Sequence, residues 1–295
     1  MRNVLSKRLK INIIVLLMFM VLPVLLLLIY IDNINSNKAE ETFRHDIGEL
    51  VSKFANSLML NTYSIKQVLV SLAAFPPVKT FDAETCSSLF AEILKQNGLY
   101  ATIVAASTFD GKIFASSVPF TPYDVSDRQY YKDAIKSRNF TAGEYLVGRA
   151  TKLSSITYSY PVMDETGEIK SVLAIALRTD QFGSMLPAAK LPDGAFIVVL
   201  DRNFTCLYSS DERDGFVPGK RVEKTVSDTI QAMTANSSNV IFESFIGNGL
   251  KILCFEQLHL KENNAPYIYA GVITPHSELT KVQSYEFRRN ILIVT

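Results

Sequence analysis

Residues 11–31, INIIVLLMFMVLPVLLLLIYI, form an apolar run without a charged residue, and they decide the architecture of this chain. About 20 such residues cross the hydrocarbon core of a bilayer as a helix. The segment before them, MRNVLSKRLK, carries basic residues and no acidic one, and basic residues are retained on the cytoplasmic side. We therefore predict a cytoplasmic N-terminus at 1–10, a transmembrane helix at 11–31 and an extracytoplasmic remainder.

The alternative to this anchor is a cleaved signal peptide. A signal peptide has a shorter apolar core, about 7–15 residues, which ends at a small-residue cleavage site. Here the run is longer and continues into Asp32-Asn33-Ile34-Asn35. The pattern therefore favours an anchor.

The other end of the chain repeats the signal. Residues 276–295 are predicted to form a helix, and its last segment, 291–295 (ILIVT), follows Arg288 and Arg289. These apolar residues either end an amphipathic helix or begin a second transmembrane helix that continues beyond Thr295. We favour the second, because the chain between the two ends reads as one extracytoplasmic unit.

Composition excludes several classes of function. Lys and Arg number 30 against 29 Asp and Glu, so no basic field is available to hold nucleic acid. The three histidines are widely separated and make no metal-ligand spacing, and we expect no cofactor. Of the three cysteines, Cys206 and Cys254 both fall in predicted strands; they could pair only if their Cβ atoms lie close together.

A long stalk helix is predicted over 32–77. Its apolar residues recur in steps of three, four and seven, which is the period of one helix face, and Pro76-Pro77 ends it. The stripe packs either on the body of its own domain or on the same helix of a second subunit, so a homodimer is expected under the second alternative. Its residues include Phe43, Ile47, Leu50, Phe54, Leu58, Ile65, Leu69 and Leu72.

The rest of the chain follows a period-two pattern in two similar stretches, 78–190 and 191–275. In the first, strands are predicted at 100–107, 112–117, 145–148, 155–163 and 169–178, with a helix that Ser126-Asp127 caps and that runs to about 138. In the second, strands are predicted at 195–200, 205–209, 240–246, 250–258 and 267–273, with a helix at 222–234. The fold class is therefore α+β, with two tandem antiparallel sheet modules behind one long helix.

Four short motifs in the first stretch carry a family resemblance. They are Asp127-Arg128-Gln129-Tyr130-Tyr131, GEYLVGR at 143–149, YSYPVMD at 158–164, and Gly167 followed by SVLAI at 171–175. Together they resemble the membrane-distal module of double Cache domains, the extracytoplasmic sensor regions of bacterial chemoreceptors, sensor histidine kinases and diguanylate cyclases. The resemblance implies a receptor of the cell (inner) membrane with two PAS-like modules. The module at 78–190 would be distal to the membrane and the module at 191–275 proximal to it. The resemblance further implies a small ligand in the distal module and an output module beyond Thr295.

The resemblance also implies a ligand site, carried over position by position. It assigns binding roles to Arg128, Tyr123, Tyr130, Tyr131 and Tyr145, with Arg149 as a rim charge and Tyr160 as a core aromatic in weaker roles. Two positions depart from the amino-acid-binding pattern of the family: Tyr130 replaces a Trp, and Ala176 replaces a late Asp that would accept an ammonium group. A carboxylate ligand without a charged amine is therefore expected.

The chemistry of Arg128 is consistent with this expectation. A guanidinium offers a planar fork of donors that matches a carboxylate. The alternative is an ordinary surface arginine paired with Asp124 or Asp127. The alternative function, an anchored extracytoplasmic hydrolase, would need a base beside a nucleophile, and no histidine has such a partner in the sequence.

Overall fold

The computed structural model describes residues 2–186, 190–235, 237–261 and 263–284. The chain divides into two units: one holds the residues up to Asp46 with those from His276 onward, and the other is Ile47–Pro275. In the first unit, helix α1 (Arg2–Ala74) begins and contains Pro23, and a helix covers 276–284. Within the described residues, α1 is the one helix long and apolar enough to cross a membrane, with a mean hydropathy of 2.7 in its apolar window. The expected second span at 291–295 lies outside the described residues.

The first sheet has the strand order β2-β1-β5-β4-β3 and is antiparallel throughout. Helix α4 (Gln129–Ser137) contacts β3, β4 and β5 of this sheet. Helix α3 (Ala83–Gln96) packs at β1 and β2, after the short helix α2 (Pro76–Lys79). The strands are β1 (Tyr100–Ser107), β2 (Ile113–Ser116), β3 (Thr141–Val147), β4 (Ser154–Met163) and β5 (Ile169–Arg178).

The second sheet repeats this topology, with the order β7-β6-β10-β9-β8. A 3-10 helix, η1 (Thr179–Met185), follows the first sheet, and helix α5 (Lys224–Thr234) contacts β8 and β9 of the second. Its strands are β6 (Phe196–Asp201), β7 (Cys206–Ser209), β8 (Asn239–Ile246), β9 (Gly249–Leu260) and β10 (Asn263–Pro275). The predicted α+β class with two tandem antiparallel sheets is confirmed.

The cysteines do not pair. Cys206 lies on β7 and Cys254 on β9, and β6 and β10 stand between these strands. Neighbouring strands are about 4.8 Å apart, so the two residues are too far apart for a disulfide. With Cys86, both are buried free thiols.

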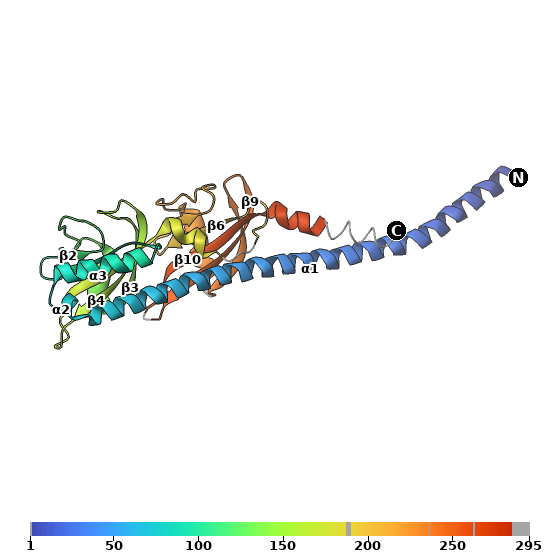
Figure 1. The fold of residues 1–295 in the computed structure, drawn as a ribbon. Coiled ribbons are helices and arrows are strands. Elements are labelled where there is room, and N and C mark those ends of the chain that lie inside the picture. Colours follow the sequence, from blue (N-terminus) through green and yellow to red (C-terminus); the bar gives the residue numbers. More distant parts are fainter. Residues whose placement is uncertain (1, 187–189, 236, 262, 285–295) are drawn as a thin grey trace. The chain divides into compact units, whose positions relative to one another are not determined.

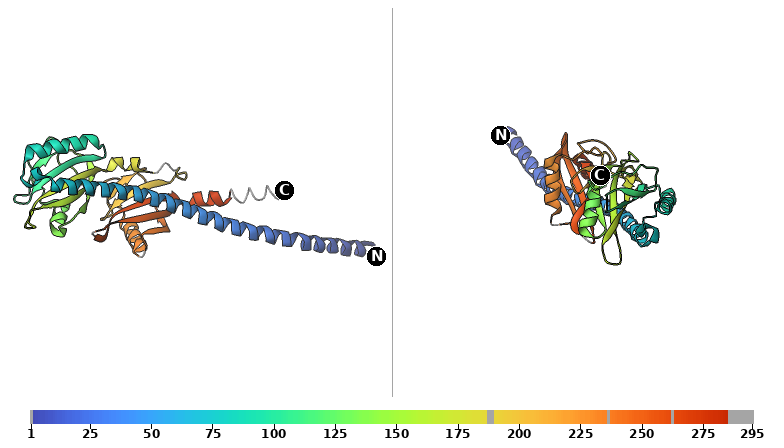
Figure 2. Two further views of the ribbon diagram at one scale, coloured as in Figure 1. Left: turned by 60° about the horizontal axis from the view of Figure 1, so that its bottom comes forward. Right: turned by 90° about the vertical axis from the view of Figure 1, so that its left-hand side faces the viewer.

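The part of α1 after residue 47 runs along both sheets (Figures 1 and 2). This packing buries the apolar stripe of the helix. Phe54, Leu58 and Leu69 are at most 2% exposed within a single protomer. The structure therefore favours packing on the chain's own domain for this stripe. The outer positions of the same helix are mostly polar, although Leu60 is 70% exposed.

A buried hydroxyl cluster ties α1 to both sheets. The hydroxyl of Thr62 lies 3.1 Å from that of Tyr158 on β4 and 2.9 Å from that of Tyr267 on β10. It also donates toward the carbonyl of Leu58, at 3.0 Å. Burial raises the pKa of both tyrosines, so they remain neutral hydrogen-bond donors. One side chain of the stalk therefore contacts a polar group from each module.

The sequence-based predictions missed one helix and misplaced one helix cap. Helix α3 was not predicted, although Asp82 caps it by accepting from the backbone N–H of Thr85. The cap of α4 is Arg128, not Ser126-Asp127, because these two residues form a turn in which Asp124 accepts from the backbone N–H of Ser126.

Candidate functional site

The segment 123–128 is held against the β1–β2 hairpin by backbone hydrogen bonds. The N–H of Ile113 donates to Tyr123, and the N–H of Val125 donates to Gly111. Gly111 has φ +69°, and a Cβ there would lie 2.6 Å from Asp124 Oδ1. The turn at Asp110-Gly111 therefore needs its glycine for the segment to dock. This docking brings Tyr123 and Arg128 over the sheet.

A narrow cavity lies between this segment and the sheet. About 40 Å³ of it is open to the centre of a water molecule. Four strands supply its floor and the segment 123–130 its roof, because alternate residues of a strand share one face. The lining consists of Thr102, Val104, Tyr123, Val125, Arg128, Tyr130, Leu146, Gly148, Arg149, Thr157, Ala174 and Ala176.

Arg128 lines this cavity without a protein partner. Among the described residues, its guanidinium forms no hydrogen bond and no ion pair. The alternative of a surface pair with Asp127 is not realised, because Asp127 bonds to Arg149 instead, at 2.6 Å. Arg128 is also the N-cap of α4, whose first turn has no acidic residue and no side-chain cap. Its positive charge therefore adds to that of the uncapped helix N-terminus, where anions are stabilised.

Arg149 forms the rim of the cavity. Its guanidinium bonds to Asp127, donates to the backbone carbonyl of Asp124 and lies 5.9 Å from the centre of the Tyr123 ring. The hydrogen bond from Arg149 is the main reason that the pKa of Asp127 lies below its usual value. A wider outer recess shares Tyr123 and Arg149 with the cavity, so these two residues stand between the cavity and the outside.

The side-chain hydroxyls of three lining residues have no hydrogen-bond partner among the described residues; these residues are Tyr123, Tyr130 and Thr157. Burial raises the pKa of Tyr123 and Tyr130, with Arg149 and Arg128 opposing the rise. Both phenols therefore stay protonated and can donate. Gly143 permits this arrangement, because a Cβ there would lie 2.9 Å from the carbonyl oxygen of Thr157 and 3.2 Å from Tyr130 Cβ.

The structure places the other predicted residues elsewhere. The hydroxyl of Tyr131 donates to the carbonyl of Ser107 at 3.0 Å, inside the apolar cluster under α4. Tyr145 bonds to Ser154 at 2.8 Å and approaches Gly219 of the second module. Tyr160 is half-buried on β4 and does not line the cavity. Tyr123, Arg128, Tyr130 and Arg149 are therefore the predicted residues that come together.

Sequence reasoning missed Thr157 as a lining residue, although it lies one residue before Tyr158 in a quoted motif. Ala176 lies in the floor of the cavity, on β5, where it pairs with Thr157. None of the described lining residues is Asp, Glu, His or Cys, so the lining carries two positive charges, Arg128 and Arg149, and no negative one. The arrangement can bind an anion, and it offers no carboxylate to an ammonium group.

No protein-family model matches this sequence, and no curated protein matches it. Solved structures do match the fold. The extracellular domain of rpHK1S-Z16, a protein classed as a histidine kinase, superposes with a TM-score of 0.64 at 13% identity over 81% of this chain and 97% of that one.

Two chemoreceptor domains are similar in the same way. The ligand-binding domain of the Pseudomonas aeruginosa PAO1 amino acid chemoreceptor PctB, in complex with L-Arg, has a TM-score of 0.58 at 16% identity, over 81% of this chain and 96% of that one. The ligand-binding domain of the Campylobacter jejuni chemoreceptor Tlp3, in complex with L-valine, has a TM-score of 0.60 at 11% identity, over 84% of this chain and 98% of that one. The chain thus has the fold of these extracellular ligand-binding domains, which is the fold that the resemblance to double Cache domains implied.

Proposed function

We propose that this chain is the extracytoplasmic ligand-sensing region of a bacterial transmembrane receptor, and that it binds a small carboxylate in the cavity under Arg128. The observation that carries the proposal is the guanidinium of Arg128, which lines the cavity with no ion-pair partner among the described residues. A ligand carboxylate would accept its paired N–H donors, and the hydroxyls of Tyr123, Tyr130 and Thr157 supply further donors.

The size of the cavity limits the ligand. A water needs about 10–15 Å³ of such space, so 40 Å³ holds on the order of three waters. A carboxylate of about three to six non-hydrogen atoms matches that volume. The absence of an acidic group in the lining favours a carboxylate without an ammonium group over an amino acid.

The cavity also favours a binding role over the hydrolase alternative. Nucleophilic catalysis requires a nucleophile with a base within hydrogen-bond reach, and the described lining has hydroxyls but no His, Asp or Glu. In the proposed topology, residues 1–10 are cytoplasmic, α1 crosses the inner membrane, and the module at 78–190 is distal to it. A homodimer and an output module beyond Thr295 belong to the same proposal.

The test is calorimetry on the full chain in lipid nanodiscs, with acetate, propionate, glycolate, pyruvate and lactate and with glycine and alanine as matched amino acids. At least one non-amino carboxylate should bind better than its amino acid counterpart. Arg128→Ala should abolish binding, since losing a desolvated charged contact costs about 2–5 kcal/mol. Arg128→Lys should recover little, because a point charge does not reproduce the fork.

Arg178→Ala is the matched control, because Arg178 is a surface arginine that pairs with Asp180 away from the cavity. It should bind as the parent chain does. Normal binding by Arg128→Ala, or tightest binding by an amino acid, would show that the site has been misassigned.

A further inference from the structure

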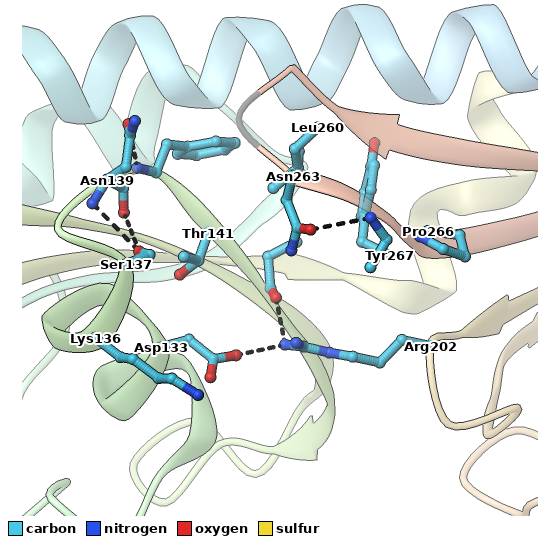
Figure 3. Close-up of a pocket in the computed structure, with 13 residues that line it drawn as sticks. Asp133, Lys136, Ser137, Asn139, Thr141, Arg202, Leu260, Asn263, Pro266 and Tyr267 are labelled. Atoms are coloured by element: carbon cyan, nitrogen blue, oxygen red, sulfur yellow. Dashed lines mark hydrogen bonds and ion pairs between the residues drawn. The ribbon is translucent and has the colours of Figure 1, made fainter.

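A second and larger cavity lies between the two sheet modules. By the same measure as the first it holds about 390 Å³, close to ten times the 40 Å³ of the cavity under Arg128. The first module contributes the C-terminal half of α4 and the start of β3, and the second contributes Arg202 and the β9–β10 hairpin (Figure 3). Its residues are separate from those of the first cavity.

Arg202 is the central charged group of this cavity. Its Nη2 donates to Asp133 on α4 at 2.8 Å and to the backbone carbonyl of Ala142 on β3 at 2.5 Å. Figure 3 shows the guanidinium reaching from the second module toward Asp133 of the first. Among the described residues its Nη1 has no hydrogen-bond partner, and its Nε is buried without one. The guanidinium therefore keeps donor capacity that the protein does not use, and an unpaired buried donor is costly.

The charge balance of the cavity is positive. The charged residues that line it are Arg202, Lys136 and Asp133, which gives two positive charges against one negative. Lys136 is exposed on the last turn of α4 and has no ion-pair partner among the described residues. Because Asp133 is already engaged by Arg202, Lys136 and Nη1 of Arg202 remain available to an anion.

The uncharged part of the lining is mixed. Its apolar side chains are Phe140, Ala142, Leu260, Ala265, Pro266 and Tyr267, and its polar ones are Ser137, Asn139, Thr141 and Asn263. Apolar side chains with a few convergent polar groups are typical of a small-molecule site. We propose that this cavity is a second binding site, for an organic anion with a flat apolar body, and that the anion pairs with Arg202 and Lys136.

A ligand here would contact both modules and the elements that form the first cavity. The N-cap of α4, Arg128, and Tyr130 in its first turn line the first cavity, and Lys136 and Ser137 in its last turn line the second. Strand β3 likewise passes from Thr141 at the second to Leu146 at the first. A ligand in the second site would therefore contact the same helix and strand whose other ends line the first cavity.

The test uses 4-fluorobenzoate as probe and its neutral isostere 4-fluorobenzamide, observed by fluorine NMR with the full chain in nanodiscs and with empty nanodiscs as background. We expect 4-fluorobenzoate to bind with a Kd of about 1 mM or lower. The amide should bind about tenfold more weakly, because it lacks the negative charge that strengthens the hydrogen bonds to Arg202 and Lys136. Arg202→Gln should weaken binding about tenfold and Lys136→Gln about threefold.

Lys132→Gln is the matched control, because Lys132 is an exposed lysine of the same helix outside the cavity. It should bind the probe as the parent chain does. Arg128→Ala should still bind the probe, so failure of the first site and failure of the second are distinguishable.

The proposal is overturned if the parent chain does not bind 4-fluorobenzoate, or if the amide binds as tightly. It is also overturned if Lys136→Gln and Lys132→Gln behave alike, or if Arg128→Ala removes the binding.

Discussion

Replacing Thr62 by Val removes the one hydroxyl that both Tyr158 and Tyr267 contact, while keeping the shape of the side chain nearly unchanged. A threonine hydroxyl has one hydrogen and two lone pairs. That hydrogen is shared between the hydroxyl of Tyr158 and the carbonyl of Leu58, and a lone pair accepts from the hydroxyl of Tyr267. Both tyrosines therefore depend on Thr62.

The expected loss of stability follows from burial. Thr62, Tyr158 and Tyr267 are 1%, 1% and 4% exposed, so water cannot replace the lost partner. A buried polar group left unsatisfied costs about 1–3 kcal/mol, which gives about 2–6 kcal/mol for the two tyrosines. Replacing all three groups together, as Thr62→Val, Tyr158→Phe and Tyr267→Phe, should recover most of this loss, because no orphaned hydroxyl remains.

The assay is guanidinium unfolding of the full chain in detergent micelles, followed by near-ultraviolet circular dichroism, since the chain has thirteen tyrosines and no tryptophan. The matched control is Thr229→Val on α5, where an exposed hydroxyl donates to the carbonyl of Thr225 in the same i to i−4 manner. It should change the free energy of unfolding by no more than about 0.5 kcal/mol. If Thr62→Val loses no more than this control, or if the triple variant is less stable than the single one, the reasoning is refuted.

Two further predictions concern α1 and the cysteines. In membranes, Leu60→Cys and Ser64→Cys should cross-link between protomers, because both positions are exposed, Leu60 by 70%. Phe54→Cys should not cross-link, because Phe54 is fully buried. No cross-link at any exposed position would argue against a dimer along this helix. Burial raises the pKa of Cys86 to about 11 and that of Cys206 and Cys254 to about 12. At pH 8 all three should resist iodoacetamide in the folded chain and react when it is unfolded, and mass spectrometry that found a Cys206–Cys254 disulfide would contradict the fold.

The strands could be predicted because their signal is local. Period-two alternation and turns such as Asp110-Gly111 mark strand and hairpin directly in the sequence, and the sheets formed where they were expected, although the β8–β9 turn is Gly247-Asn248 and Gly249 begins β9. Helix α3 was missed although Asp82 begins it and Cys86 and Phe90 are spaced by one helical turn on its buried face. Its apolar residues Cys86, Leu89, Phe90, Ile93 and Leu94 follow the spacing of one helix face, so this helix was within reach of the sequence.

The site was harder to predict because it depends on choices between distant partners. Arg128 has no ion pair with Asp127 because Asp127 pairs with Arg149 instead. Arg149 lies after strand β3, so this choice of partner cannot be read from the local sequence. The direction of Tyr145 depends on the irregular register of β3 between Ala142 and Tyr145. Since neighbouring strand residues face opposite sides and Leu146 lines the cavity, Tyr145 points away from it.

Strand β4 has a consequence for how such a cavity could report its contents. Thr157 faces the cavity and the next residue, Tyr158, faces the stalk. Two consecutive residues of one strand share a peptide plane and cannot shift independently. A ligand that displaces Thr157 would therefore also displace Tyr158, whose hydroxyl contacts Thr62 on the stalk helix. The message to the stalk would depend on how far the ligand extends and not only on how tightly it is held, so two carboxylates of equal affinity and different length could act as activator and antagonist.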